Sequence, residues 1–494
     1  MKITRTTLLK ASPFAALIAG FAGGALAMAL PNLELGTTQR AVVAPAEQAE
    51  PYLHLVQAQP LARTAPNSQG QVQLSFAPVA AQAGPAVVNV YAQRVVRGRG
   101  ISRDPFFGRF GAPRVEQSLG SGVIVRADGV IVTNNHVVEG AQSLKVVLAD
   151  RREFDAELLL ADPRVDLAVL RIDTGAEAMP ILAFADTHAL QVGDLVLAIG
   201  NPFGLSQTVT SGIISALART EVGVSDYAFF IQTDAAINRG NSGGALVDMN
   251  GALVGVNTAI FSEGGGSNGV GFAIPSEMVR RVVESALSGG RTVVRPWLGA
   301  SVQPVTQDLA RSMGMARPEG VLVSQLYPRA AGERAGLRQG DVIVSVAGVE
   351  VRDEAGVRYQ FATQRPGARV PLVIQRNGAR RSLTANAEPP PGGAPEAREL
   401  SGRHPLSGAR VVTLTPATAE AVGLDPFAAG VFIQALDRGG VAARVGFRPG
   451  DIISEINGRA IGDAAELDRA LTQAQAWVIA LERNGQRGEI RFGM

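Results

Sequence analysis

Short apolar runs separated by turn residues fill the chain from residue 87 to about residue 260. The clearest runs cover residues 118–125, 193–199 and 253–257. Short runs at such regular spacing predict an all-β domain that closes into barrels. One longer run, residues 276–287, is followed by Gly289-Gly290 and predicts a helix that ends the domain.

The second half of the chain repeats itself at an offset of 110 residues. Residues 336–343 align with residues 446–453, and Gly348 aligns with Gly458. Two copies of one domain are therefore expected. Asn377-Gly378 and Asn484-Gly485 each predict a hairpin turn near the end of a copy, and the proline-rich residues 389–393 predict a linker between the copies.

The first 73 residues differ from the rest in composition. Three basic residues precede an apolar run at residues 13–30, which contains Ala-Leu-Ala and Ala-Met-Ala. This pattern predicts an export signal over residues 1–30, with an uncleaved membrane anchor as the alternative. Residues 31–73 are rich in Ala, Pro, Gln and Thr without periodicity, which predicts a flexible tether. Either way, the body of the chain is expected to be exported.

Composition excludes some functions. The chain has 494 residues, 46% of them hydrophobic, which suits about three folded domains. Its formal charge is +2 and the basic residues are dispersed, so no nucleic-acid partner is expected. No lysine follows a glycine, so the sequence has no Gly-Lys-Ser/Thr phosphate loop. The absence of cysteine is compatible with an oxidising compartment.

A candidate nucleophile lies in residues 238–244, Asn-Arg-Gly-Asn-Ser-Gly-Gly. The glycines allow a tight turn that gathers backbone N–H groups at one point, where an oxyanion could be held. A serine hydroxyl is a weak nucleophile, so Ser242 needs a base, and the base needs a group that fixes its tautomer. A purely structural turn is the alternative.

The base and the acid can be chosen by elimination. His136 follows the apolar run at residues 129–132, whereas His54, His188 and His404 lie in polar or low-complexity surroundings and are expected to face solvent. Several aspartates lie between His136 and Ser242. Asp166 heads the apolar run 167–170, where a carboxylate must be hydrogen-bonded, and a histidine Nδ1–H would satisfy it.

The order His136, Asp166, Ser242 is that of chymotrypsin-type proteases. Four motifs together resemble the HtrA (Deg/Do) family of serine proteases from about residue 75 to the C-terminus. They are Thr-Asn-Asn-His-Val-Val (133–138), Asp-Leu-Ala (166–168), Gly-Asn-Pro-Phe-Gly (200–204) and Gln-Thr-Asp-Ala-Ala-Ile-Asn-Arg-Gly-Asn-Ser-Gly-Gly (232–244). His136 could instead be half of a metal site, but the sequence shows no second ligand cluster, so neither metal nor cofactor is expected.

The resemblance implies an all-β protease domain, a chymotrypsin-like double β-barrel, over residues 74–290. Two small α+β or sandwich-like PDZ domains follow at residues 291–388 and 401–494, joined by a linker at 389–400. Ser242 would attack, His136 would carry the proton and Asp166 would orient His136. The oxyanion hole would use backbone N–H groups of Gly240, Asn241 and Ser242, and the S1 pocket would be lined by Ile237 and Ile260.

A PDZ domain binds a peptide as an added strand and holds its terminal carboxylate with N–H groups of a loop. In the first copy the resemblance places that loop at Trp297, Leu298, Gly299 and Ala300, with hydrophobic C-terminal peptides as ligands. In the second copy it falls at Leu406, Ser407, Gly408 and Ala409, where the polar Ser407 leaves peptide binding open. A simple turn is the alternative for both loops.

The resemblance also implies regulation and assembly. Arg219 falls in a sensor loop between the first PDZ domain and the active site, with a solvated surface arginine as the alternative. Phe76 falls in the contact of a homotrimer, or of a multiple of trimers. The expected function is ATP-independent cleavage of misfolded or unfolded exported proteins in the periplasm, with the inner membrane as a further site of attachment. A chaperone or binding scaffold and a protease with one membrane signalling substrate are the alternatives.

Overall fold

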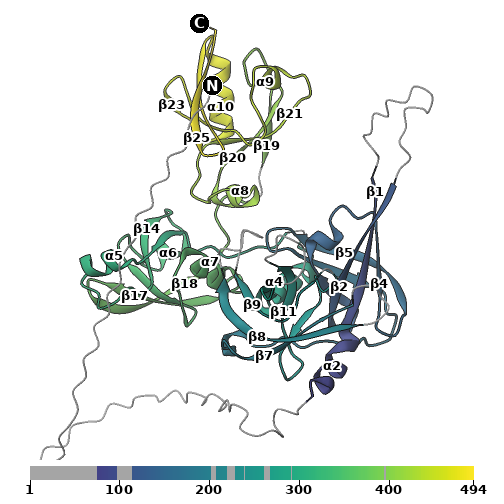
Figure 1. Cartoon of the computed structure of the whole chain (residues 1–494). Helices are drawn as coiled ribbons and strands as arrows, with labels where there is room; N and C mark the ends of the chain where they lie inside the picture. Colours follow the sequence, from purple (N-terminus) through teal and green to yellow (C-terminus); the bar gives the residue numbers. More distant parts are fainter. Residues whose placement is uncertain are drawn as a thin grey trace, which may run out of the picture. The chain divides into compact units, whose positions relative to one another are not determined.

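The computed structural model describes residues 75–96, 114–201, 207–219, 229–238, 240–260, 268–290, 292–393 and 396–493, which all belong to one compact unit, Gln73–Met494 (Figure 1). The expected export signal and tether lie outside the described residues. Among the helices of the described part, none has the length and apolar character needed to cross a bilayer.

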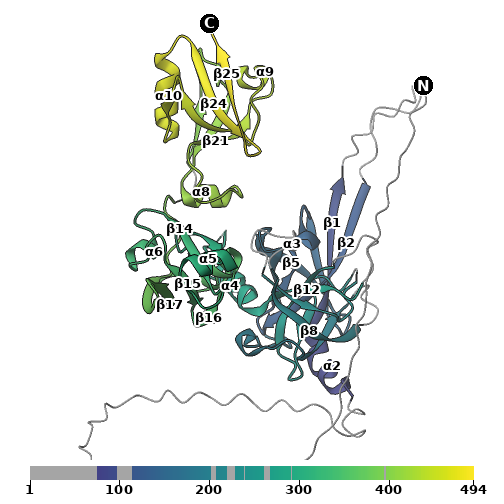
Figure 2. The same ribbon diagram turned by 60° about the vertical axis from the view of Figure 1, so that its left-hand side comes forward.

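The first barrel is closed and antiparallel, in the strand order β1-β2-β3-β6-β5-β4. Figure 2 shows β1 and β2 side by side. It is preceded by helix α2 (Ala77–Ala83) and the short 3-10 helix η1 (Gly84–Ala86). A short helix, α3 (Asn135–Val138), follows the third strand. The strands are β1 (Val87–Val96), β2 (Arg114–Arg126), β3 (Val130–Thr133), β4 (Ser143–Val147), β5 (Glu153–Asp162) and β6 (Leu167–Ile172). Every residue of β3 is buried, as the apolar run predicts.

The second barrel is also closed, in the order β10-β11-β12-β9-β8-β7. A 3-10 turn, η2 (Thr187–Ala189), precedes it. Its strands are β7 (Leu195–Gly200), β8 (Thr208–Arg219), β9 (Phe230–Thr233), β10 (Ala245–Val247), β11 (Leu253–Ile260) and β12 (Gly271–Pro275). The two six-stranded barrels confirm the expected protease fold.

Helix α4 (Ser276–Leu287) ends the barrel region where the sequence predicts it. Its buried residues include Met278, Val279, Val282 and Val283, one face of an amphipathic helix that packs against strands of both barrels. Beyond the helix, Gly289 has φ 77° and its N–H donates to Ala286 O at 3.2 Å. This left-handed residue stops the helix, as the Gly-Gly pair indicates.

The first repeat forms a sheet in the order β13-β14-β15-β17-β18, with β16 paired to β15. Its elements are β13 (Ala300–Pro304), α5 (Gln307–Ser312), β14 (Val321–Leu326), α6 (Ala331–Arg334), β15 (Val342–Val346), β16 (Val349–Glu350), α7 (Glu354–Ala362), β17 (Arg369–Arg376) and β18 (Ala379–Asn386). It has its own apolar core, which includes Val321, Ile343, Phe361 and Leu372.

The second repeat has the same element order and one extra strand at its edge, giving β19-β20-β21-β22-β24-β25 with β23 paired to β22. Its elements are β19 (Ala397–Leu400), β20 (Ala409–Thr413), α8 (Pro416–Ala421), β21 (Val431–Leu436), α9 (Val441–Arg444), β22 (Ile452–Ile456), β23 (Arg459–Ala460), α10 (Ala464–Gln473), β24 (Trp477–Arg483) and β25 (Gln486–Phe492). Residues 397–400, expected in the linker, therefore belong to the sheet of the second repeat.

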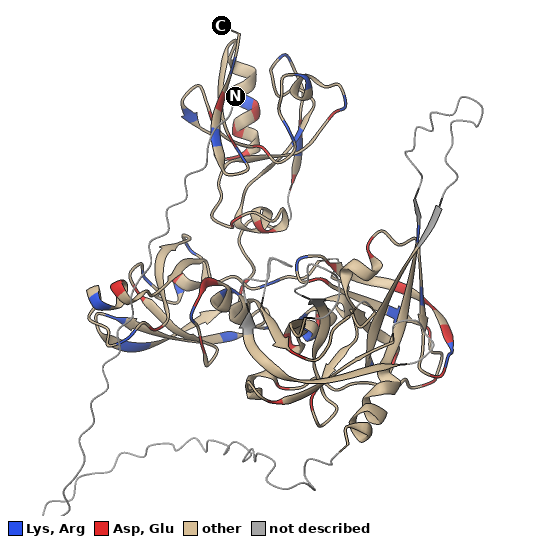
Figure 3. Ribbon diagram, viewed as in Figure 1, with Lys and Arg blue, Asp and Glu red and all other residues tan. Residues whose placement is uncertain are grey.

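Both expected hairpin turns are present. Asn377 and Gly378 have φ 52° and 77°, and Asn484 and Gly485 have φ 49° and 76°. Two successive positive φ angles are the mark of a type I′ turn, which Asn-Gly favours. Figure 3 shows Lys and Arg dispersed among Asp and Glu over all the described domains, in keeping with the small net charge.

Candidate active site

The Ser242 turn is held between the two barrels by Ser121 of β2. The Ser121 N–H donates to Ser242 O at 2.8 Å, and the Ser121 hydroxyl donates to Gly240 O at 2.5 Å. Gly243 has φ 83°, and a Cβ there would lie 2.1 Å from Ser121 O. Both the backbone angle and the close approach therefore require glycine.

Two backbone donors face no acceptor beside the serine. Within the described residues, no oxygen accepts from the N–H of Gly240 or of Ser242, whereas the Asn241 N–H donates to Asn238 O at 3.0 Å. Gly240, at φ 107°, turns the chain between them. The expectation that Asn241 also supplies a donor is wrong for this geometry, because its N–H is used inside the turn. Gly240 and Ser242 can hold an oxyanion.

His136 and Asp166 form a hydrogen-bonded pair. Nδ1 of His136, which follows β3 in helix α3, lies 2.8 Å from Oδ2 and 3.0 Å from Oδ1 of Asp166. The His136 backbone N–H also donates to Oδ1, at 3.0 Å. Asp166 is 8% exposed and has φ 56°, a left-handed angle that aspartate tolerates, and it directly precedes β6. The carboxylate favours a proton on Nδ1 and leaves Nε2 as the base.

Thr258 of β11 contacts both Asp166 and Ser242. The sequence alone did not identify it as a site residue. Its hydroxyl donates to Asp166 Oδ2 at 2.6 Å, while its carbonyl oxygen accepts from the Ser242 hydroxyl at 3.4 Å. Among the described residues, the Ser242 hydroxyl makes no hydrogen bond to His136. The only sequence signal was that polar Asn257-Thr258 interrupts an apolar strand.

The structure describes the other expected residues of the protease domain in less detail. Ile237 is 1% exposed and packs against Gly271 of β12. Ile260 and Arg219 are the last residues of β11 and β8, and their side chains lie outside the described residues. Phe76, directly before α2, is 37% exposed, a large apolar side chain at the surface.

The loop of the first repeat leaves backbone donors free. Leu298 O and Gly299 O accept from the N–H groups of Gly332 and Tyr327, at 2.7 and 2.8 Å. In the described part of the chain, nothing accepts from the N–H of Leu298 or of Gly299. Strand β13, which begins at Ala300, is an edge strand, and a groove between it and α7 is lined by side chains that include Val302, Val357 and Phe361.

In the second repeat, His404 differs from its expectation. The sequence suggested that it faces solvent, but the side chain is 6% exposed in the loop between β19 and β20. Burial lowers the pKa of His404, and a hydrogen bond with the backbone of Ser401 opposes the shift. The folding of the loop buries the ring, which the local polarity of the sequence does not reveal.

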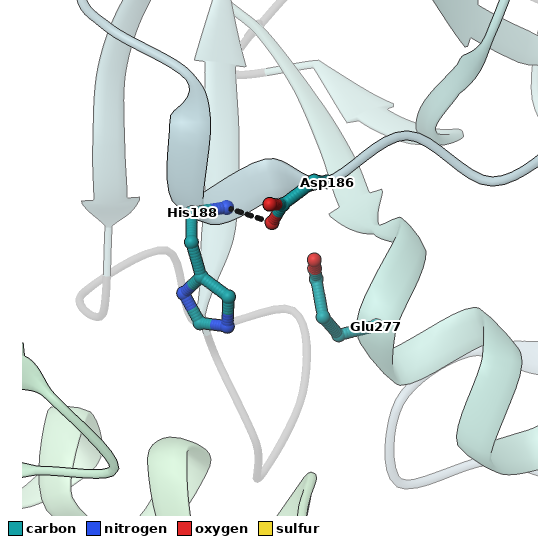
Figure 4. A group of neighbouring side chains, drawn as sticks. All are labelled: Asp186, His188 and Glu277. Carbon is teal, nitrogen blue, oxygen red and sulfur yellow. Dashed lines mark hydrogen bonds between the residues drawn. The ribbon is translucent and has the colours of Figure 1, made fainter. Parts of the chain in front are cut away.

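One group of described side chains could hold a metal ion. Asp186, His188 and Glu277 place ligand atoms within 4.8 Å of one another (Figure 4). Glu277, from the first turn of α4, already accepts from the backbone N–H and the hydroxyl of Thr187. His188 is exposed, as expected, and this group shares no residue with the serine site.

Known proteins resemble the chain in both halves. A trypsin-like peptidase domain model matches residues 120–256, and a PDZ domain model matches residues 322–376 and 432–481. A probable periplasmic serine endoprotease, DegP-like, of Chlamydia trachomatis serovar D is 38% identical over 433 residues, covering 82% of this chain and 85% of the relative. The periplasmic serine endoprotease DegP of Escherichia coli K12 is 41% identical over 373 residues, covering 75% of each chain.

A solved structure, the HtrA-type protease AlgW with a tripeptide, is 44% identical, with a TM-score of 0.50, and covers 65% of this chain and 99% of that chain. The matched domains, the long similar relatives and the two barrels followed by two PDZ domains agree with one another. The chain belongs to the HtrA (DegP-like) family of serine endoproteases.

Proposed function

We propose that this chain is a periplasmic, ATP-independent serine endopeptidase that cleaves misfolded or unfolded exported proteins. The observation that carries the proposal is the site geometry: an oriented His136-Asp166 pair beside a serine flanked by the unused N–H groups of Gly240 and Ser242. Such a site suits acyl transfer from a peptide bond.

Each catalytic group acts once in the acylation of Ser242 and once in the hydrolysis of the acyl-enzyme. Ser242 Oγ attacks the carbonyl carbon as His136 Nε2 takes its proton, and the N–H groups of Gly240 and Ser242 hold the oxyanion. His136 then gives the proton to the leaving amine, and the acyl-enzyme remains. Water, deprotonated by His136, attacks the ester and releases the second product, while Asp166 stabilises the imidazolium throughout.

Replacement of Ser242 tests the assignment. Ser242→Ala should lower kcat on unfolded casein by about a million-fold, because the nucleophile is lost. Circular dichroism on the same sample should show an unchanged fold. Wild-type turnover in this variant would refute the role of Ser242. Proteomics of substrates trapped by Ser242→Ala would then identify the proteins that the enzyme receives.

The S1 site is proposed to take small aliphatic residues. Ala236, six residues before the nucleophile, carries no charge, and the buried Ile237 follows it. Together with Ile260, these residues provide no carboxylate for Arg or Lys at P1. A cleavage map of unfolded casein should therefore be dominated by Val, Ala or Ile, and a preference for Arg or Lys would contradict the assignment.

Two other functions use the same architecture. A protease with one membrane signalling substrate is supported by the likeness to AlgW, and the trapped-substrate experiment would return one protein instead of many. A chaperone is supported by the PDZ domains alone, and an intact site with no measurable turnover would favour it.

Assembly and location complete the proposal. Exposed Phe76 is proposed to contact a neighbouring chain in a trimer, since large exposed apolar side chains often mark interfaces. Light scattering on Phe76→Ala tests this, and a particle as large as the wild type would remove Phe76 from the contact. Attachment of the N-terminus to the inner membrane is tested by fractionation of cells.

A further inference from the structure

The two PDZ domains differ at the strand that would receive a peptide. In the first domain β13 pairs only with β14 among the described strands, and its other edge faces a groove that Leu424 and Phe427 of the second domain also line. In the second domain the matching strand, β20, has β21 on one side and β19 on the other. Both strands begin at the carboxylate loop and pair with the following strand in the same way, with a bulge after the second residue. The edge used by β19 is therefore the edge at which a PDZ ligand adds.

Strand β19 runs in the direction of a bound peptide. It is antiparallel to β20, with Leu400 opposite Ala409 and Ala397 opposite Val412. Its last residue, Leu400, thus lies at the carboxylate loop, where the C-terminal residue of a ligand would lie. The Gly408 N–H in that loop donates to Leu400 O at 2.8 Å, so a carbonyl oxygen of the chain takes the place of a ligand carboxylate.

Two further loop donors are also used. The Ser407 N–H donates to His404 O at 3.2 Å, and the Ala409 N–H donates to Leu406 O at 3.1 Å. In the first domain, by contrast, the N–H groups of Leu298 and Gly299 meet no acceptor among the described residues. Among the described residues, the free pair of N–H groups at Leu298 and Gly299 thus has no counterpart at the matching positions Ser407 and Gly408, whose N–H groups are both used.

The side chains of β19 also occupy ligand positions. Leu400 is 1% exposed and packs in the apolar core of the second domain. Two residues earlier, Arg398 donates to Asp468 Oδ2 on α10 at 2.9 Å. Helix α10 packs against β20, as α7 packs against β13. An apolar residue at the loop and a polar contact to the flanking helix two residues earlier are the contacts of a peptide added to a strand.

We propose that the second PDZ groove is filled by the chain's own segment Ala397–Leu400, a built-in ligand ending in Arg-Glu-Leu. A short tether gives such a segment an effective concentration on the order of millimolar. A free peptide of equal intrinsic affinity therefore fails to displace it at micromolar concentration. The first domain is then the peptide receptor of the resting enzyme, and the second opens only to peptides that compete with Arg-Glu-Leu.

The test uses the full chain with Ser242→Ala and a synthetic decapeptide that ends in Ala-Arg-Glu-Leu with a free carboxylate. Mass spectrometry confirms that the peptide stays intact. Hydrogen exchange reports the two domains separately, because a bound peptide should protect residues 300–304 in the first and displacement of β19 should expose residues 397–400 in the second. Without further substitution, residues 300–304 should gain protection with micromolar peptide, and residues 397–400 should lose protection only with millimolar peptide.

Leu400→Asp should release β19, because it places a carboxylate where Leu400 is buried. Affinity for the decapeptide at 409–413 should then rise by about tenfold or more. Glu399→Ser, at the exposed neighbouring position, is the matched control and should leave the affinity unchanged. No gain in Leu400→Asp, with exchange in β24 and β25 still slow, would overturn the proposal.

A disulfide between β19 and β20 tests the proposal without unfolding the second PDZ domain. Glu399 and Arg410 are directly opposite one another, and the chain has no cysteine, so Glu399→Cys with Arg410→Cys can form a single disulfide. In the oxidised protein, millimolar peptide should leave residues 397–400 protected, and after reduction the same peptide should expose them. Unchanged protection of residues 397–400 in both forms would show that peptide binds away from this edge.

Discussion

At the scale of single residues, Thr258 links the two halves of the candidate active site. Its hydroxyl is a third donor to Asp166, beside the backbone N–H and the ring of His136. Hydrogen bonds to charged groups contribute about 1.5–3 kcal/mol. Thr258→Val, which keeps the shape and removes the hydroxyl, should therefore lower kcat about ten- to hundredfold with little change in KM.

Thr258→Ser is the matched control, because it retains the hydroxyl and should recover most of the activity. Steady-state kinetics over a range of pH would also show a changed profile for the valine variant if Asp166 is repositioned. An unchanged kcat in Thr258→Val would mean that the two His136 contacts suffice to hold the carboxylate.

His404 should make the second PDZ domain sensitive to acid. Its pKa is lowered in the folded state by burial, while the unfolded pKa is about 6.5. Above that pH both states are neutral and stability is unaffected; as the pH falls below it, the unfolded state binds the proton more readily and stability is lost. His404→Gln, which does not titrate, should remove this loss between pH 7.5 and 5.

The measurement is unfolding by urea followed through Trp477 in a Trp297→Phe background, since these are the chain's two tryptophans and each PDZ domain holds one. His188→Gln, at an exposed histidine, is the control and should leave the pH dependence as it was. An acid-sensitive midpoint that persists in His404→Gln would assign the effect to another group.

Residues that act in local motifs could be identified from the sequence. Ser242 lies among glycines, and His136 and Asp166 each lie beside a buried strand, so residue type and neighbours suffice. Thr258 and His404 could not be assigned in this way. Thr258 acts through a contact across the fold with Asp166, whereas His404 is buried by the folding of its own loop, and the local pattern carries neither piece of information.

At the scale of elements, each PDZ domain contains an equivalent ion pair between an arginine and a buried aspartate. Arg376 binds both carboxylate oxygens of Asp341 at 2.6 and 2.7 Å, and Arg483 binds Asp451 at the same two distances. Each arginine precedes an Asn-Gly turn and also donates to a glycine carbonyl. The pair joins the loop before the third strand of the domain to the terminal hairpin.

Loss of one partner should destabilise one domain only. The side chains of Asp341 and Asp451 are 1% and 0% exposed, so a neutral amide there leaves an arginine without its charge partner. Asp341→Asn should lower the free energy of unfolding of the first domain by about 3 kcal/mol, and Asp451→Asn should do so for the second. Trp477 fluorescence in a Trp297→Phe background reports the second domain, and Trp297 fluorescence in a Trp477→Phe background reports the first domain together with its contact to Phe427. An equal effect of Asp341→Asn on both signals would show that the domains unfold together.

The repeat itself, the Asn-Gly turns and helix α4 could be predicted because turn residues and apolar periodicity are local signals. Strand β19 could not. Its sequence Ala-Arg-Glu-Leu has a single apolar side chain at the end and follows a proline-rich stretch, so it reads as linker. Only pairing with β20, nine or more residues further along, makes it a strand.

At the scale of the whole molecule, the asymmetry between the PDZ domains bears on regulation. The first domain has an edge strand and free loop donors, and Arg219 ends β8 in the second barrel. A peptide can stimulate cleavage only if it binds the active state more tightly than the resting state. A coupling of about 1–3 kcal/mol would change that affinity roughly five- to 150-fold.

A hydrophobic C-terminal peptide should therefore raise the cleavage rate of a fluorogenic substrate in the full chain and in a chain truncated after residue 393, because both keep the first PDZ domain. A chain truncated after residue 290 should show no stimulation. Arg219→Ala should weaken stimulation, since the guanidinium offers several fixed donors to loop carbonyls, whereas Arg171→Ala in the first barrel should not. Stimulation that survives truncation after residue 290 would place the sensor in the barrels, and stimulation that disappears on truncation after residue 393 would place it in the second PDZ domain.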